Sequence, residues 1–310
     1  MNRDEIQRAM QRIDRYVRRT PITELERGDA RIVLKLESMQ RSGSFKARGA
    51  FNSLLAKPVS GRGVITASGG NHGAAVAYAA HKLGVRSEIF VPTITSPVKL
   101  ARLREYAAAV TVIGNSYAEA HEASLIRAKE TKARYIHAYD QPEVIAGQGT
   151  VAMELEIQAA DLDTLLVSVG GGGLLAGCLS WYEQSVRIIA VEPSRAPTLA
   201  KAMEAGQPVD VEVSGIAADS LGARRVGELM FPLAQQFLDR VVLVEDSDIA
   251  MAQALLWSSM RLVVEPGGAA ALAALTAGRY RPSAGEKVGV VVCGGNADLS
   301  KLAQLAGSPG

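Results

Sequence analysis

The chain has 310 residues, 48% of them hydrophobic, so it can bury a substantial core and form about two domains. Its 34 Lys and Arg residues nearly balance its 32 Asp and Glu residues, and basic residues cluster only as arginines scattered through residues 1–20. This composition does not indicate nucleic-acid binding.

The N-terminus and the cysteines bear on the cellular setting. The first five residues lack the apolar run of a signal peptide, and no stretch approaches the ~20 apolar residues that span a bilayer. We therefore expect a cytoplasmic protein without a membrane partner. Cys178 and Cys293 lie far apart and without His or Cys neighbours at metal-ligand spacing, which predicts neither a disulfide nor a structural zinc site.

The first half of the chain begins with a predicted helix. Apolar side chains recur every three or four positions between residues 3 and 18, which indicates an amphipathic helix that ends before Thr20. From Ile32 onward, short β-rich runs alternate with helical patterns, as in βαβ units with a parallel sheet. The strands are predicted at 32–37, 64–66, 88–91 and 110–113, and the helices end near 84, begin near 97 and cover 117–129.

The second half repeats this alternation. A long helix is predicted at about 143–160, and strands are predicted at 165–169, 187–191, 241–244 and 288–292. The two sets of strands predict an α/β protein with two doubly wound sheets. The join at the long helix has no Pro/Ser-rich linker, so we expect two closely packed domains. Residues 306–310 carry no structure signal.

The stretch Ser42–Gly49 places Lys46 directly after Phe45, at a predicted strand-to-helix turn. A Ser/Gly turn behind an apolar strand can deliver the lysine amine into a cleft. Removal from water would lower the lysine pKa and free a neutral amine to form a Schiff base with a carbonyl. The alternative is a solvated lysine behind a serine-rich helix cap.

The loop Ser68–Gly73 lies between a predicted strand and a predicted helix. Its glycines lead into a helix N-terminus, where free backbone N–H groups and the positive dipole end suit an anion such as a carboxylate. Asn71 adds an amide donor. The alternative is a plain capped turn in which His72 is a partly exposed bystander.

The run Gly170–Gly173 also lies between a strand and a helix. Consecutive glycines cost backbone entropy, which predicts that a ligand must approach the main chain closely. A phosphate held by backbone N–H groups is the natural candidate, and a loose loop is the alternative.

The same run partly matches a dinucleotide-binding fingerprint. Gly171, Gly173 and Ala176 take the fingerprint positions, and Glu192 follows at about the distance of a ribose-binding carboxylate. That fingerprint normally opens its domain, whereas this one lies mid-chain. It also leaves the lysine and the 68–73 loop unexplained.

The segment Cys293–Asn296 follows a strand that should be buried. Ligands bind at strand C-termini in open α/β sheets, although Cys293 could equally be a small core residue. The segment Glu265–Gly268, predicted to be a turn, is a weaker signal.

Together these motifs resemble, over nearly the whole chain, the fold-type II (tryptophan synthase β-like) pyridoxal-phosphate enzymes. The resemblance lies in the branch of serine/threonine dehydratases (threonine ammonia-lyases), which is related to serine racemase. It implies pyridoxal 5'-phosphate in a cleft between two doubly wound open-sheet domains. The large domain would be 1–51 plus 142–310, and the small, mobile domain 52–141. A homodimer is also implied.

The resemblance assigns roles to individual residues. Lys46 would hold the cofactor and later move the Cα proton, Phe45 would pack near the ring, and Asn71 would bind the ring hydroxyl. The implied cofactor-binding set is Phe45, Lys46, Asn71, Gly170, Gly171, Gly172, Gly173, Leu174 and Cys293. The implied substrate-binding set is Ser68, Gly69, Gly70 and His72.

Three positions depart from the patterns of relatives. Cys293 stands where many relatives place a serine near the pyridine nitrogen; neither is an aspartate, which suits elimination through a weak electron sink. Glu192 matches a divalent-cation ligand of racemase-like members, but Thr198 lies where they carry an acid, so we expect no metal. Racemase members carry a serine at the position of Gly69.

We therefore expect a lyase that converts L-threonine or L-serine, small-molecule substrates, into 2-oxobutanoate or pyruvate and ammonia. The alternatives are a serine racemase, a dehydratase of another β-hydroxy amino acid, and a NAD-dependent oxidoreductase. The 17 residues after Cys293 are too few for a regulatory domain at that end, so we expect no feedback module there.

Overall fold

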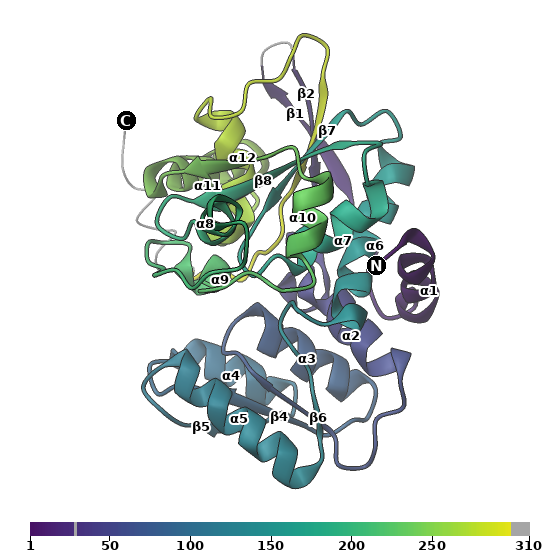
Figure 1. Ribbon diagram of the computed structural model, residues 1–310, viewed down its shortest axis with the longest axis vertical. Helices are drawn as coiled ribbons and strands as arrows, with labels where there is room; N and C mark the ends of the chain where they lie inside the picture. Colours follow the sequence, from purple (N-terminus) through teal and green to yellow (C-terminus); the bar gives the residue numbers. More distant parts are fainter. Residues whose placement is uncertain (28–29, 299–310) are drawn as a thin grey trace.

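The computed structural model describes residues 1–27 and 30–298, which form two lobes (Figure 1). The predicted structureless tail at 306–310 lies outside the described residues. The α-helices are α1 (Arg3–Ile13), α2 (Lys46–Ala56), α3 (Asn71–Lys82), α4 (Pro97–Glu105), α5 (Tyr117–Thr131), α6 (Pro142–Gln158), α7 (Gly173–Tyr182), α8 (Thr198–Ala205), α9 (Ala218–Leu221), α10 (Phe231–Phe237), α11 (Asp246–Met260) and α12 (Pro266–Thr276).

The strands form two sheets, one in each lobe. They are β1 (Ile22–Arg27), β2 (Ala30–Lys35), β3 (Val64–Ala67), β4 (Ser87–Val91), β5 (Ala109–Val112), β6 (Arg134–Tyr135), β7 (Thr164–Ser168), β8 (Arg187–Pro193), β9 (Arg240–Val244) and β10 (Lys287–Val291). The six-stranded sheet has the order β1-β2-β10-β7-β8-β9 and the four-stranded sheet the order β5-β4-β3-β6. Apart from the antiparallel pair β1 and β2, the strand pairs of the described residues are parallel.

The six-stranded sheet, with the helices on its faces, makes up the large lobe. Leu165 and Val167 pack with residues of α6, α7 and α10, whereas Leu166 packs with residues of α11 and α12. Because successive side chains point to opposite faces and helices cover both, the central strands are apolar throughout. This explains why short continuous apolar runs predicted them.

The four-stranded sheet forms the small lobe together with α3, α4 and α5. Val64 and Ile89 pack with α3 and α4, and Ile65 and Phe90 face α5. The N-terminal part of α2 and the start of α6 bound this lobe in the sequence (Figure 1). We propose that 52–141 is a mobile domain that moves against 1–51 plus 142–310.

Three local predictions differ from the structure. Strands β1 and β6 were not predicted, because β1 alternates charged residues at a sheet edge and β6 has only two residues. The predicted turn Glu265–Gly268 is instead the start of α12, where Pro266 takes the first helical positions. Proline suits that site because the first helical N–H has no intrahelical partner. Among the described residues, no helix combines the length and apolar character needed to cross a membrane.

Candidate active site

Lys46 is the first residue of α2, at the end of a segment pinned to the large sheet. Two 3-10 turns, Glu37–Met39 and Arg41–Gly43, follow β2. Ser44 then bridges to Gly294, and the Phe45 N–H donates to the Cys293 carbonyl over 3.2 Å. The predicted strand-to-helix connection is therefore present, and it brings Lys46 to the carboxyl end of β10, where open α/β sheets bind ligands.

The amine of Lys46 is half-buried and has a neutral partner. Its Nζ donates to the Ala138 carbonyl over 2.7 Å and lies 5.1 Å from the centre of the Phe45 ring. Burial lowers the pKa of Lys46 to about 8, although Cys293 and Glu265 partly oppose that shift. An appreciable fraction of the amine is therefore neutral near pH 8, as a nucleophile or base requires.

The glycine run forms an open cradle at the N-terminus of α7. Gly172 has φ +90°, a left-handed conformation that favours glycine, and no side chain of the described residues caps the helix. A Cβ on Gly171 would overlap the ring of Tyr139. Leu174 is buried in the first turn of α7. The uncapped N–H groups and the helix dipole make this cradle suited to a phosphate.

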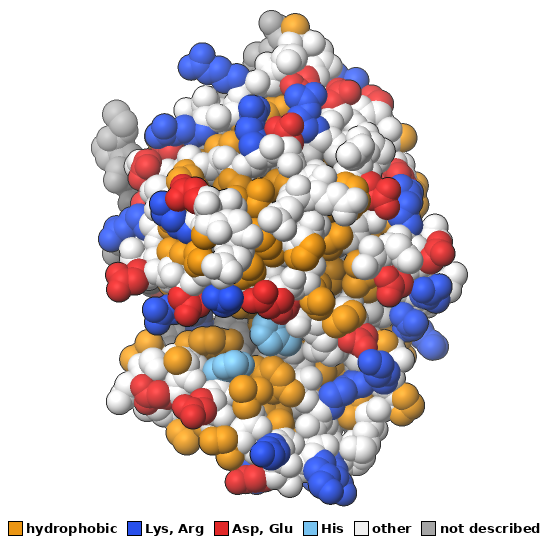
Figure 2. All heavy atoms as spheres, in the orientation of Figure 1, with side chains coloured by type: hydrophobic (Ala, Val, Ile, Leu, Met, Phe, Trp, Pro, Cys, Tyr) orange, Lys and Arg blue, Asp and Glu red, His pale blue; other side chains and the backbone are white. Residues whose placement is uncertain are grey.

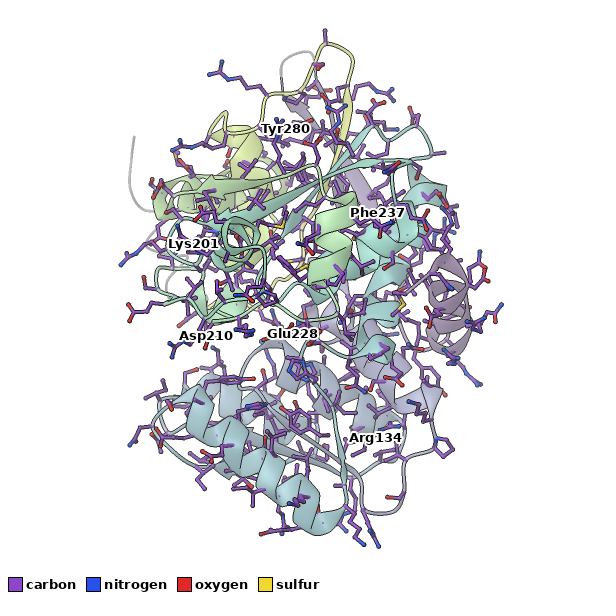
Figure 3. The ribbon with its side chains drawn as sticks, in the orientation of Figure 1. Arg134, Lys201, Asp210, Glu228, Phe237 and Tyr280 are labelled. Atoms are coloured by element: carbon purple, nitrogen blue, oxygen red, sulfur yellow. The ribbon has the colours of Figure 1, made fainter. Side chains whose placement is uncertain are left out.

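Tyr139 belongs to a crossover segment, 136–141, that the sequence did not single out. The Tyr139 hydroxyl donates to the Arg225 carbonyl over 3.1 Å, and the Asp140 carboxylate accepts the Leu229 N–H over 2.9 Å. Glu228, beside Leu229, lies on the edge of the large lobe that faces the small lobe (Figure 3). Histidine side chains are visible along the line where the lobes meet (Figure 2).

The loop Ser68–Gly73 joins β3 to α3. The Gly70 N–H donates to the Ser68 hydroxyl over 3.2 Å, and Gly70 is the residue just before α3. The first N–H groups of α3 receive no side-chain cap from the described residues. This geometry supports the predicted carboxylate-binding role, which stays a prediction.

The Asn71 side chain connects the two lobes. Its amide donates to the Glu265 carboxylate, and its carbonyl accepts the Asn296 amide over 2.6 Å. Glu265 is buried, and burial raises its pKa to about 7. The sequence had flagged both partners only as parts of glycine-containing segments, so their contact with Asn71 is a finding of the tertiary structure.

His72 is not an exposed bystander. Its Nε2 lies 3.0 Å from the Thr66 hydroxyl and 3.2 Å from the Ile136 carbonyl, and the ring is buried. Burial, followed by the nearby charge of Lys46, lowers the pKa of His72 to about 3, so the ring is neutral. These contacts hold the ring inside the small lobe and leave its backbone N–H, in the first turn of α3, for the predicted substrate role.

Cys293 is buried at the end of β10. Its Sγ donates to the Gly267 carbonyl at 3.3 Å, and burial raises the pKa of the thiol well above its usual range. Cys293 is therefore a neutral thiol. It cannot supply the negative charge that would hold a pyridine nitrogen protonated.

Glu192 caps a helix. Its two carboxylate oxygens accept the N–H groups of Leu199 over 2.7 Å and Ala200 over 2.9 Å, at the start of α8. Thr198 donates to the Ala223 carbonyl over 2.8 Å. Burial raises the pKa of Glu192 to about 8 despite these bonds. These backbone N–H groups thus bond to the carboxylate that the sequence suggested as a ligand of a ribose or a metal.

Comparison with known proteins identifies the family. A family model described as "Pyridoxal-phosphate dependent enzyme" matches residues 13–294. L-threonine ammonia-lyase of Geobacter sulfurreducens is 38% identical over 306 residues, covering 96% of this chain and 76% of the relative. Phenylserine dehydratase of Ralstonia pickettii is 35% identical, covering 96% and 93%. The structure of maize serine racemase superposes with a TM-score of 0.92 at 34% identity, covering 98% of this chain and 96% of that one.

The chain belongs to the pyridoxal-phosphate-dependent enzyme family. The predicted α/β fold, with two doubly wound sheets, is confirmed, as is the cofactor that the motifs implied. The residues present also fit this cofactor. They offer an amine with a lowered pKa, an uncapped glycine cradle, and, in Ser44, a buried hydroxyl without a hydrogen-bond partner among the described residues. The dinucleotide interpretation of the glycine run is not supported.

Proposed function

We propose that this protein is an ammonia-lyase that dehydrates and deaminates L-threonine or L-serine. The observation that carries the proposal is Gly69, which offers no proton-transferring side chain in the predicted carboxylate-binding loop. The relative named L-threonine ammonia-lyase, 38% identical to this chain, supports the same reaction class. The products would be 2-oxobutanoate or pyruvate and ammonia.

Each residue contributes a defined task to this reaction. Pyridoxal phosphate, when bound, supplies the electron sink for charge that develops at Cα. Lys46 would hold the cofactor, and its amine would move the Cα proton. The N–H groups of the glycine cradle would hold the phosphate. The neutral thiol of Cys293 would offer no negative charge to a bound pyridine ring, which would keep the cofactor a weak electron sink and suit loss of the β-hydroxyl group.

The Ser68–Asn71 loop, which leads into α3, positions the substrate in this proposal. It binds the substrate α-carboxylate through its N–H groups. Asn71 donates to Glu265 and accepts from Asn296, and these two bonds fix the side chain that would bind the ring hydroxyl. Orientation of this kind contributes to rate by fixing the reacting groups in advance.

A racemase is the second candidate, because maize serine racemase superposes on this chain with a TM-score of 0.92. Racemisation needs proton-transfer groups on both faces of Cα, and Lys46 supplies one. A Cβ on Gly69 would lie 2.9 Å from Thr95 Cγ2, so a serine here would require the Thr95 side chain to shift. The lack of a side chain at Gly69 favours the lyase.

A panel of L- and D-threonine, serine and phenylserine tests the proposal. Purified holoenzyme should release oxo acid from an L-β-hydroxy amino acid, and chiral analysis of residual L-serine should show almost no D-serine. D-serine accumulating as fast as pyruvate would make the protein a racemase. Absence of oxo acid from every substrate would refute the lyase assignment.

A further inference from the structure

An ion pair joins the two lobes at the mouth of the cleft. Lys99 of α4, in the small lobe, pairs with Asp219 of α9, in the large lobe. The Asp219 side chain is 72% exposed and that of Lys99 is 30% exposed. Isolated surface pairs contribute little to stability, so the position of this pair matters more than its strength.

Asp219 lies against the loop proposed to bind the substrate carboxylate. Its main-chain oxygen is 3.6 Å from the place that a Cβ on Gly70 would take. The next residue, Ser220, accepts the Gly267 N–H over 3.2 Å, which ties α9 to the start of α12. This contact places the main chain of Asp219 beside a loop suited to an anion, and the exposed Asp219 carboxylate pairs with Lys99.

Lys99 is delivered by a segment that also covers this loop. Thr95, just before α4, packs on Gly69, and Lys99 follows one turn later in the same segment. Glu265 and Arg102 also interact with this pair: beyond the effect of burial, Asp219 raises the pKa of Glu265, while Lys99 and Arg102 lower it. Lys99 is the cation paired directly with Asp219.

We propose that Lys99 is a positioning residue for substrate binding, which neutralises Asp219 so that the anionic α-carboxylate of an amino acid can approach the Ser68–Asn71 loop. Without Lys99, the Asp219 carboxylate repels the incoming carboxylate across the partly solvated cleft. The proposal rests on the amino-acid binding assigned above, but it does not depend on which reaction follows.

The test uses holoenzyme and two ligands that differ in charge. L-alanine has no leaving group on Cβ, so it reports α-carboxylate binding without elimination; L-alaninamide lacks the carboxylate charge. Dissociation constants follow from the change in the visible absorption of the cofactor. Lys99→Met should weaken L-alanine binding about tenfold and L-alaninamide binding less than about twofold. A tenfold loss of affinity corresponds to ~1.4 kcal/mol.

Charge rescue separates this role from a structural one. Adding Asp219→Asn to Lys99→Met should return L-alanine affinity to within about threefold of the wild type, because the repelling charge is then gone. Lys99→Arg, which keeps the charge, should bind L-alanine almost normally. Lys201→Met is the control: Lys201 pairs with Glu204 at 2.8 Å on α8, on the outer part of the large lobe (Figure 3), and its loss should change nothing.

The outcomes are distinct. Equal loss of both ligands in Lys99→Met, or a loss that persists with Asp219→Asn, overturns the charge-neutralising role. Unchanged L-alanine affinity in Lys99→Met overturns it as well, and a wild type that binds no L-alanine refutes both this inference and the amino-acid site. A wild type that binds L-alanine but turns over neither L-threonine nor L-serine refutes the lyase proposal alone.

Discussion

Two lysines, Lys35 and Lys46, lie on either side of the β2–α2 connection, and their amines have different hydrogen-bond partners. Lys35 Nζ donates to Glu154 over 2.7 Å, to Gln158 over 2.7 Å and to the Thr20 carbonyl over 2.8 Å. Lys46 Nζ donates to the neutral Ala138 carbonyl. Burial lowers the pKa of both lysines, but Glu37 and Glu154 oppose the shift at Lys35.

Arg48 extends the contrast, because it lies one turn or less from Lys46 in the same helix. Its guanidinium is fully buried and makes 2.8 Å hydrogen bonds to both Glu37 and Glu154. Burial alone would lower the pKa of Arg48, but the two carboxylates more than offset that effect. The network bonds permanent charge directly to carboxylates, whereas the amine that must be neutral bonds to a carbonyl, and Glu265 only partly opposes the effect of burial on its pKa.

The largest expected effect follows from removing the site amine. Lys46→Ala should reduce turnover by at least ~100-fold, because it deletes the cofactor-holding group and the proton-transfer base together. Borohydride reduction and peptide mass spectrometry should locate the cofactor on Lys46 in the wild type. A variant that keeps a tenth of the wild-type kcat would show that another residue moves the proton.

The next effect is on the free energy of unfolding, for which Arg48 and Lys35 should matter more than Lys46. Arg48→Met should lower the free energy of unfolding by ~3–5 kcal/mol, because buried Glu37 loses its charged partner and Glu154 loses one of its two. Lys35→Met should cost less, ~1–3 kcal/mol, since Glu154 keeps Arg48. Lys46→Met should cost less than ~0.5 kcal/mol, because it leaves no buried carboxylate unpaired. Urea unfolding of the three variants checks this order; a Lys46→Met variant as unstable as Arg48→Met would contradict it.

The pH dependence of stability should reveal the lowered pKa of Lys46. The folded pKa of Lys46 is about 8 and its ordinary value 10.5, so between these values the unfolded apoprotein binds more protons than the folded one. Its contribution to stability therefore rises with pH across that window, by at most ~1.4 kcal/mol per unit. Lys46→Met should remove this slope. Urea midpoints of apoprotein and variant between pH 7.5 and 10.5 measure the difference, and parallel profiles would argue against the shift.

The smallest expected effect concerns Glu192, a buried carboxylate that has backbone N–H groups in place of a cation. Among the described residues, no group of three or more His, Cys, Asp or Glu side chains is placed to hold a metal ion. Chelator treatment of the holoenzyme should leave kcat and KM largely unchanged, because oxygen-rich cages are what Mg²⁺ and Ca²⁺ require. A large loss of activity that is reversed by adding Mg²⁺ or Ca²⁺ would reveal a cation site that does not involve these contacts.

The fold class and the elements that carry the site could be predicted from the residues alone. Apolar periodicity reflects burial along one element, so the central strands and α6 were predicted within a few residues of their positions. The glycines at 170–173 and the lysine behind Phe45 stood out because their residue types are costly unless something specific requires them. The edge strand β1, with charges at alternate positions, carries no such signal.

Several side-chain contacts became visible only in the folded structure. Asn71 joins Glu265 and Asn296, and Glu192 turns to the N-terminus of α8 instead of the cleft. The sequence did not predict the pairing of Lys99 with Asp219 either, because each residue alone is typical of a solvated surface charge. Sequence patterns encode which face of an element is buried, whereas the contacts of Asn71 and of Lys99 depend on how the two lobes pack, and that of Glu192 depends on how α8 follows β8. The reactivity of Lys46 follows from the same packing, since the fold bonds Lys35 and Arg48 directly to carboxylates and gives the Lys46 amine a neutral carbonyl. Burial then lowers the pKa of Lys46, and Cys293 and Glu265 oppose that shift only in part.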